Sequence, residues 1–199
     1  MARDLPGKYL VRQLGKTKLV GRIVEVEAYR QNDPASHAFG GRTQRNDVMF
    51  WEGGHLYVYF TYGMHFCANV VTGKAGIGEA VLIRAVEPVE GIDEMIRNRF
   101  RTVTGKKKLR DARNTKLANH QLTNNQSPLD LTNGPAKLCE ALTIRRETNG
   151  TDLLGDEVYL LNAPRLSSSK VNRSTRIGIT NGKEKKWRFS IKGNPWVSR

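Results

Sequence analysis

Alternating apolar and polar residues in the first third of the chain predict β-strands. The clearest alternation covers residues 19–29 and predicts one long strand. Because side chains point alternately to the two faces of a strand, Glu25, Glu27 and Tyr29 share one face. Ile23 lies on that same face, whereas the residues between them point the other way, toward the expected core.

Shorter apolar runs separated by turn residues predict further strands. Their ranges are 8–14, 56–62, 66–71, 80–86, 157–161, 176–180 and 187–192. Gly63 and Met64 lie between the second and third of these runs and predict a hairpin turn. Pro88 and Gly91 predict the end of the fourth. Residues 30–55, rich in Gly, Asn, Asp and Pro, predict a long loop, and loops of this length inside a compact domain are usually functional or disordered.

Helical spacing of apolar residues predicts two helices in the second half of the chain. Residues 92–103 predict an amphipathic helix with an arginine-rich outer face. Residues 135–142 predict a second, shorter helix, since proline suits the first helical turn. Between them, residues 105–130 are polar and basic and predict a mobile basic loop. With no internal repeat, the pattern indicates a single domain over residues 1–199, of the mixed α+β class.

The chain is strongly basic, and its charge is unevenly distributed. Lysine and arginine number 33 against 19 acidic residues, which gives a net charge of +14 and a pI near 10.1. Basic residues concentrate in 97–116 and 165–199, whereas 19–29 carries two glutamates. This balance favours a polyanionic partner, most commonly nucleic acid, although simple solubility or adhesion to an anionic membrane would also produce it. An acidic strand within a basic body indicates an enzyme with a carboxylate in a DNA-facing cleft.

Apolar runs and cysteines indicate the compartment. No stretch approaches the roughly 18 consecutive apolar residues that a membrane-spanning helix requires. The first residues lack the apolar segment of a secretory signal, so we expect a protein that is not secreted, in the bacterial cytoplasm near the nucleoid or in a nucleus. Cys67 and Cys139 lack C-x-x-C spacing, and we interpret them as buried reduced thiols.

Three sequence blocks carry a family resemblance: residues 21–29 (GRIVEVEAY), 57–69 (YVYFTYGMHFCAN) and 80–91 (AVLIRAVEPVEG). In this order and spacing they resemble the alkyladenine (3-methyladenine or methylpurine) DNA glycosylase family. Further matching blocks are DPASH at 33–37, Arg45-Asn46, Met49-Phe50, GPAKLC at 134–139, RIGI at 176–179 and WRFSIKGNPWVS at 187–198. The resemblance implies one α+β domain with a curved, mostly antiparallel, open barrel-like sheet and peripheral helices.

The chemistry that this resemblance implies needs a carboxylate beside the sugar. Hydrolysis of an N-glycosidic bond passes through an oxocarbenium-like state, which a carboxylate can stabilise while it activates water. The resemblance assigns this role to Glu27, places Arg84 beside it, and gives the backbone carbonyl of Ile177 to the attacking water. A structural salt bridge is the other role open to Arg84, because a charge within an apolar strand is rarely unpaired. Glu25 is the rival carboxylate, and we expect it to pair with a nearby arginine instead.

The resemblance also implies an aromatic pocket for an extruded base, with Tyr29, His37 and Tyr59 as its walls. Aromatic faces suit alkylated purines, many of which are cationic. Asn69 corresponds to the residue that disfavours guanine through its exocyclic amine. A two-residue turn would place Tyr59 opposite Ala68 rather than Asn69. A bulge or a different register is therefore required if Tyr59 and Asn69 both line the pocket.

Exposed and basic residues are the candidates for contact with DNA. Tyr62, at the expected hairpin tip and on the opposite strand face from Tyr59, corresponds to the family's intercalating tyrosine, which fills the gap left by the extruded base. An ordinary surface tyrosine is the alternative. The further DNA-binding candidates are Met64, Arg42, Arg45 and Lys137. The basic residues among them either contact phosphates or solvate the surface.

The resulting prediction is a base-excision-repair enzyme that flips alkylated or deaminated purines (the 3-methyladenine, hypoxanthine and ethenoadenine class) out of double-stranded DNA. Activated water hydrolyses the glycosidic bond and leaves an abasic site, and no lyase activity is expected because no lysine adjoins the pocket blocks. We expect a monomer that needs no cofactor and no metal. Two alternatives stay open: a damage-binding module without catalysis, and a metal-dependent nuclease with His37 and Asp33 as ligands, although the histidines lack the usual ligand spacing.

Overall fold

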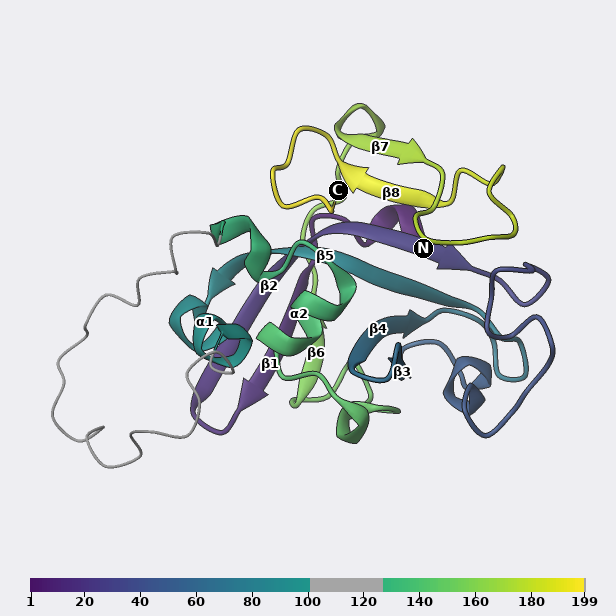
Figure 1. Ribbon diagram of the computed structural model, residues 1–199, viewed down its shortest axis with the longest axis horizontal. Helices are drawn as coiled ribbons and strands as arrows, with labels where there is room; N and C mark the ends of the chain where they lie inside the picture. The colour runs from purple at the N-terminus through teal and green to yellow at the C-terminus, as the bar shows by residue number, and fades with distance from the viewer. Residues whose placement is uncertain (101–126, 199) are drawn as a thin grey trace, which may run out of the picture.

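One antiparallel sheet curls into a half-barrel in the computed structural model, which describes residues 1–100 and 127–198 (Figure 1). Its eight strands within these ranges are β1 (Tyr9–Leu14), β2 (Thr17–Tyr29), β3 (Leu56–Thr61), β4 (His65–Val71), β5 (Ala80–Glu90), β6 (Val158–Leu161), β7 (Val171–Ser174) and β8 (Arg188–Ile191). The strand order is β3-β4-β5-β2-β1-β6, and β8 pairs with both β2 and β7. The expected α+β domain with a curved antiparallel sheet is therefore confirmed.

Strand β2 is the centre of the sheet, because it pairs with β1, β5 and β8. Both of its faces are buried, which corrects the expectation of one core face and one open face. A register shift on either side of Glu25 also breaks the strict alternation. As a result Ile23 packs in the same hydrophobic cluster as Val26, not beside the carboxylates as the sequence predicted. Bulges of this kind redirect side chains near functional sites.

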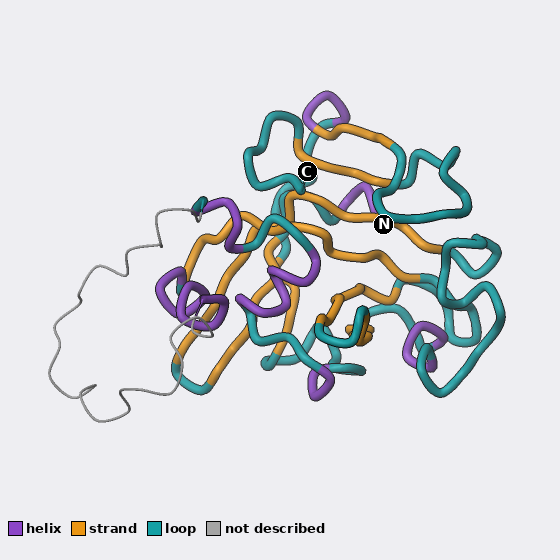
Figure 2. Tube along the Cα trace, viewed as in Figure 1, coloured by secondary structure: helices purple, strands orange, loops and turns teal. Residues whose placement is uncertain are grey.

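Two α-helices in the described part of the chain, α1 (Ile92–Phe100) and α2 (Pro135–Ala141), cover one side of the sheet (Figures 1 and 2). Helix α2 packs against β4, β5 and α1. Its first residue is Pro135, as predicted, and Leu138 and Cys139 are among its buried side chains. Together with strand residues they form the main hydrophobic core, in which each fully buried leucine or isoleucine contributes about 1.5–3 kcal/mol.

Short 3-10 helices connect the larger elements. They are η1 (Ala2–Asp4), η2 (Asp47–Phe50), η4 (Pro128–Leu131), η5 (Arg146–Thr148) and η6 (Ser168–Lys170). The predicted loop 30–55 contains η2. The predicted end of the loop 105–130 lies too late in the chain. The 3-10 helix η4 already begins at Pro128, with Ser127 as its N-cap. The rest of that loop up to residue 126, and the end of the predicted helix 92–103, lie outside the described residues.

Strand β5 is longer than the sequence predicted. It continues through Pro88 to Glu90, although proline was expected to end it. Pro88 lies opposite Gly21, where the register between β2 and β5 shifts. Proline lacks the N–H that a regular ladder requires, and an irregular position tolerates that loss. The absence of a side chain on Gly21 also matters, because a Cβ there would lie 2.6 Å from a methyl carbon of Val86.

The predicted strand 176–180 is wrong, and β7 lies earlier, at Val171–Ser174. Two features prevent an extended strand at 176–180. Arg176 is buried and forms an ion pair with Asp33, and Gly178 has a φ of +73°, outside the β region. The segment is a loop that follows β7 and reaches the candidate site.

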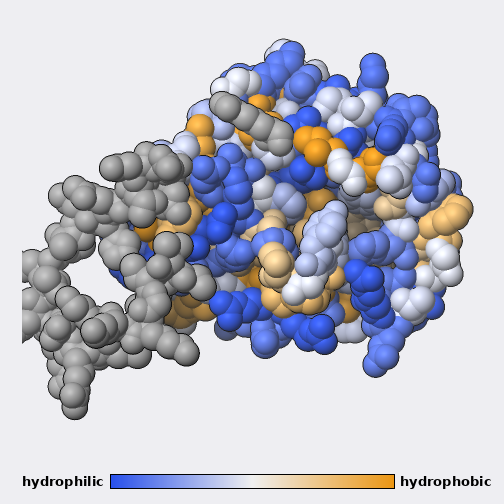
Figure 3. Space-filling view, in the orientation of Figure 1, coloured by the Kyte–Doolittle hydropathy of each residue, from blue (hydrophilic) through white to orange (hydrophobic). Residues whose placement is uncertain are grey.

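The surface view shows hydrophilic side chains over most of one face, with hydrophobic side chains in small separate patches (Figure 3). Among the large apolar residues that remain exposed are Tyr62 and Met64 at the β3–β4 turn. In the described ranges, no helix has the length and hydropathy to span a membrane.

Candidate active site

A cavity of about 370 Å³ opens between the β3–β4 hairpin, the end of β2 and the loop after β7. Its lining is Tyr29, Ala35, His37, Met49, Tyr57, Tyr59, Thr61, Tyr62, Cys67, Asn69, Leu82, Arg84, Pro135, Ile177, Gly178 and Ile179. This set contains the three predicted aromatic walls, Asn69, and the predicted Arg84 and Ile177. The cavity therefore brings together residues from blocks that are far apart in the sequence.

The register of the hairpin explains how Tyr59 and Asn69 line one cavity. The turn has three residues, Tyr62 to Met64, so Tyr59 lies opposite Cys67 and Tyr57 opposite Asn69. Directly opposed and second-neighbour residues share a face of an antiparallel pair, which places these four side chains together. The different register that the sequence analysis required is present. Tyr57 was not predicted as a pocket residue, although it is two positions from Tyr59 in β3 and therefore lies on the same face of the strand.

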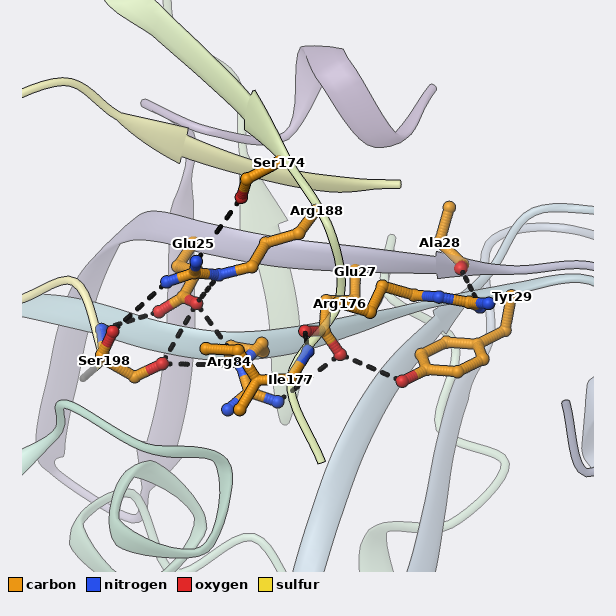
Figure 4. Close-up of polar contacts among 10 residues, drawn as sticks. All are labelled: Glu25, Glu27, Ala28, Tyr29, Arg84, Ser174, Arg176, Ile177, Arg188 and Ser198. Atoms are coloured by element: carbon orange, nitrogen blue, oxygen red, sulfur yellow. Dashed lines mark hydrogen bonds and ion pairs between the residues drawn. The ribbon is translucent and has the colours of Figure 1, made fainter. Parts of the chain in front are cut away.

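Glu27 is fully buried directly behind the cavity wall and accepts three hydrogen bonds (Figure 4). The Tyr29 hydroxyl donates to Oε2 at 2.9 Å, and Arg84 NH1 donates to the same oxygen at 3.3 Å. The backbone N–H of Ile177 donates to Oε1 at 2.8 Å. All three donors come from residues that line the cavity. A carboxylate offers about four acceptor positions, so the described residues leave one position on Oε1 for a further donor.

Glu25, two residues earlier, is also fully buried but is surrounded by protein donors. Its Oε1 accepts from Arg188 Nε at 2.5 Å and from the Ser198 hydroxyl at 2.9 Å, and its Oε2 accepts from the Ser198 N–H at 2.6 Å. Arg84 Nε approaches Oε1 to 3.3 Å. The expectation that Glu25 pairs with a nearby arginine is confirmed.

Arg84 joins the two carboxylates. Its guanidinium lies 3.3 Å from Glu25 and 3.3 Å from Glu27, and its Nε also points to the Ser198 hydroxyl at 3.4 Å. The side chain is partly buried, which matches the expectation that a charge within an apolar strand is paired. The salt-bridge role and the position beside Glu27 therefore hold together.

The aromatic side of the cavity is uncharged at neutral pH. His37 lies 4.4 Å from Tyr59 between ring centroids, and its Nδ1 lies 3.1 Å from the Tyr57 hydroxyl. Burial, and then the positive charge of Arg45, lower the pKa of His37 below its ordinary value, which favours the neutral imidazole. Burial raises the pKa of Tyr57 to about 12 and also raises the pKa of Tyr59. The cavity thus offers aromatic faces without a fixed charge of their own.

The hairpin tip projects into solvent. Tyr62 is 85% exposed and Met64 is 69% exposed. Tyr62 has a φ of +51°, an uncommon conformation for a residue with a side chain. Tyr62 and Met64 together form an apolar wedge that protrudes beside the cavity.

The basic candidates for DNA contact already have protein partners. Arg42 pairs with Asp47 at 2.6 Å, and Arg45 donates to the Phe60 carbonyl at 3.2 Å. Lys137 binds Asp130 and Asn133, each at 2.8 Å. Arg42 and Arg45 are exposed, so these contacts leave donors accessible.

Two other predictions concern thiols and metals. Cys67 and Cys139 are free and buried, which confirms the interpretation of reduced thiols. Across residues 1–100 and 127–198, no three His, Cys, Asp or Glu side chains gather into a possible metal-binding group.

Comparison with known proteins identifies the family. Residues 1–195 match the model of the methylpurine-DNA glycosylase (MPG) family. Relatives named "Putative 3-methyladenine DNA glycosylase" include one from Carboxydothermus hydrogenoformans, 46% identical over the whole chain and 92% of the relative, and one from Clostridium acetobutylicum, 46% identical over the whole chain and 91% of the relative. A relative of the same name from Methanoculleus marisnigri is 42% identical over the whole chain and 92% of its own length. The chain belongs to the methylpurine-DNA glycosylase family, whose members are DNA-repair enzymes of base excision.

Proposed function

We propose that this protein is a monofunctional glycosylase that extrudes alkylated or deaminated purines from duplex DNA and hydrolyses their bond to deoxyribose. The observation that carries the proposal is the environment of Glu27. Its carboxylate is fully buried, is held by three donors from the cavity wall, and keeps one acceptor position free. A water molecule that donates to this position becomes the nucleophile.

The proposed hydrolysis is a single substitution at C1′ of the sugar. The bond between C1′ and the base nitrogen breaks, and the base leaves with the bonding electrons. The water oxygen bonds to C1′, and its proton passes to Glu27. Arg84 and the Tyr29 hydroxyl orient the carboxylate, and the backbone carbonyl of Ile177 accepts the second hydrogen of the water. Negative charge near C1′ stabilises the oxocarbenium-like transition state. The proposal requires neither a cofactor nor a metal ion.

Base selection in this proposal comes from the uncharged aromatic walls. Tyr29, His37 and Tyr59 stack against the base, and a neutral His37 does not repel a cationic alkylated purine. The amide of Asn69 donates to the Tyr57 carbonyl at 3.0 Å, which restrains its rotation. A restrained amide can exclude the exocyclic amine of guanine. The proposed substrates are 3-methyladenine, hypoxanthine and ethenoadenine in double-stranded DNA.

Contact with the duplex is assigned to the exposed residues around the cavity. Tyr62, with Met64 beside it, fills the space that the extruded base leaves, and stacking offsets part of the cost of unstacking. Arg42, Arg45 and Lys137 contact phosphates. Because one lesion occupies one cavity, the protein acts as a monomer, in the compartment that holds the DNA.

The test is base excision on duplexes that carry one hypoxanthine or one ethenoadenine, with EDTA present and with or without alkali. We expect strand cleavage by the wild type only after alkali, and none by Glu27→Gln. Nicking without alkali that EDTA abolishes would establish the nuclease alternative. Lesion-selective binding with no release of any base, alkylated genomic DNA included, would establish the binding-module alternative.

A further inference from the structure

A second buried ion pair lies behind the cavity, between Arg176 and Asp33. Both side chains are fully buried. Besides its bond to Asp33, Arg176 NH1 donates to the Ala28 carbonyl at 3.0 Å. Asp33 also accepts from Lys185 at 3.2 Å. Burial alone would raise the pKa of Asp33, but hydrogen bonds from Arg176 and Lys185 hold it below the ordinary value. The pair is therefore charged and rigidly connected to the end of β2.

Arg176 is adjacent to two of the residues that donate hydrogen bonds to Glu27, Tyr29 and Ile177 (Figure 4). Its guanidinium carbon lies 4.6 Å from the ring centroid of Tyr29, whose hydroxyl donates to Glu27 Oε2. The next residue in the chain is Ile177, whose N–H donates to Glu27 Oε1. Two of the three donors to Glu27 are thus adjacent to Arg176, one through stacking and one through the peptide bond. The third donor, Arg84, is held separately by Glu25 and Ser198.

We propose that Arg176, held by Asp33, is a positioning residue that aligns Glu27 for the attack of water. This inference rests on the proposed catalytic role of Glu27. Arg176 is not among the residues that line the cavity. It is connected to Glu27 through Tyr29, through Ile177 and through the carbonyl of Ala28, the residue after Glu27. We therefore expect its main effect on the rate of bond cleavage, with little effect on the binding of the damaged duplex. Displacement of a catalytic group by about 1 Å costs on the order of 100-fold in rate, so a small movement of this pair is sufficient.

Gly182 gives a way to disturb the pair without changing its charge. Its φ is +64°, and a Cβ at this position would lie 2.8 Å from Asp33 Oδ1 and 3.0 Å from Arg176 NH2. The carbonyl of Gly182 also accepts a hydrogen bond from Arg176 NH2 at 3.4 Å. A methyl group added here requires the Asp33 carboxylate, the Arg176 guanidinium or the loop of Gly182 to shift, so we expect the geometry of the ion pair to change.

The experiment measures single-turnover excision of hypoxanthine at saturating enzyme, together with the dissociation constant for the same duplex. For Arg176→Lys, which keeps the charge but loses the planar fork, we expect a rate about 10- to 100-fold lower and an unchanged dissociation constant. Gly182→Ala should act in the same direction. Arg12→Lys is the matched control, since Arg12 pairs with Glu157 at 2.7 Å away from the cavity lining, and its rate should equal that of the wild type.

A double-mutant cycle separates positioning from a general loss of structure. Tyr29→Phe removes the hydroxyl through which Arg176 acts on Glu27 Oε2. The combined loss in Arg176→Lys with Tyr29→Phe should be smaller than the product of the two single losses. Multiplicative losses would overturn the proposal, as would a normal rate in both Arg176→Lys and Gly182→Ala, or a loss of lesion affinity that accounts for the loss of rate.

The same assay distinguishes this inference from the proposed function. If the wild type releases no base, or if Glu27→Gln is as active as the wild type, the proposed function fails. If release depends on Glu27 but is unaffected by Arg176→Lys and by Gly182→Ala, only the positioning role fails. Thermal melting of each variant identifies any that do not fold, and Gly182→Ala carries the test if Arg176→Lys is one of them.

Discussion

Glu25 and Glu27 are two residues apart on β2, both are fully buried, and both lie 3.3 Å from Arg84. Their surroundings nevertheless differ. Among the described residues, each carboxylate accepts three hydrogen bonds. Those to Glu25 come from Arg188 and Ser198, which do not line the cavity, and Arg84 adds an ion pair. Those to Glu27 all come from residues of the cavity wall.

This comparison shows that burial does not distinguish a structural carboxylate from a catalytic candidate. A buried charge needs partners in either case. What differs is whether the donors that hold the carboxylate line the cavity. Glu25 connects β2, β8 and the end of the described chain, whereas Glu27 is held by residues of the cavity wall and is therefore the candidate for the general base.

The largest expected effect is the loss of excision in Glu27→Gln. The amide keeps the size of the side chain but cannot accept the proton of the attacking water, so the single-turnover rate should fall about 10²- to 10⁴-fold. Gel-shift titration should show that binding to the damaged duplex persists. Glu25→Gln, measured on folded protein at low temperature, is the matched control and should retain most of its activity. A reversed order of the two rates would assign catalysis to Glu25.

The second effect is on stability and concerns Glu25→Gln. The NH2 group of glutamine would face N–H and O–H donors, and Arg188 would lose its carboxylate partner. Such a change typically costs about 3–5 kcal/mol in the free energy of unfolding. Each kcal/mol lowers the melting temperature of a chain of this size by about 2–4 °C. Calorimetry of Glu25→Gln and Glu27→Gln measures the loss of stability in each variant. An equal loss of stability in Glu27→Gln would remove the distinction between the two sites.

A smaller effect on rate is expected for Tyr29→Phe, which removes one donor to Glu27 and leaves the ring in place. A hydrogen bond to a charged group contributes about 1.5–3 kcal/mol, so excision should slow by about 10- to 150-fold. The melting temperature should fall by several degrees, because a buried carboxylate loses a donor although the ring keeps its packing. An unchanged rate would show that the hydroxyl does not support the carboxylate during the reaction.

The smallest effect is expected for Ser198→Ala, the corresponding change around Glu25. It removes the hydroxyl donor at 2.9 Å and keeps the backbone donor at 2.6 Å. We expect a loss of about 1.5 kcal/mol in the free energy of unfolding, the low end for a hydrogen bond to a charged group, and a normal excision rate. Denaturant titration and the excision assay check the two parts. A fall in rate equal to that of Tyr29→Phe would indicate that the Glu25 cluster acts on catalysis through Arg84.

Local pattern predicted much of the fold and the location of the site. Alternation identified β2 and the hairpin strands, and proline at a first helical turn identified α2. The blocks that carried the family resemblance contain the residues that line the cavity. Errors occurred where a tertiary contact overrode the local pattern. The segment 176–180 has apolar alternation, but its buried ion pair and the positive φ of Gly178 make it a loop.

The sequence by itself determined which side chains were available, the excess of positive charge, and the strands on which the two glutamates stand. Only the tertiary structure decided which donors surround each glutamate. Ile177 lies 150 positions after Glu27, and Ser198 lies 173 positions after Glu25, yet each donates to its partner. Local periodicity reports neighbours within an element and contains no information on contacts at such separation. The curled sheet brings these distant donors to β2, and so separates a closed ion-pair cluster from a candidate catalytic base.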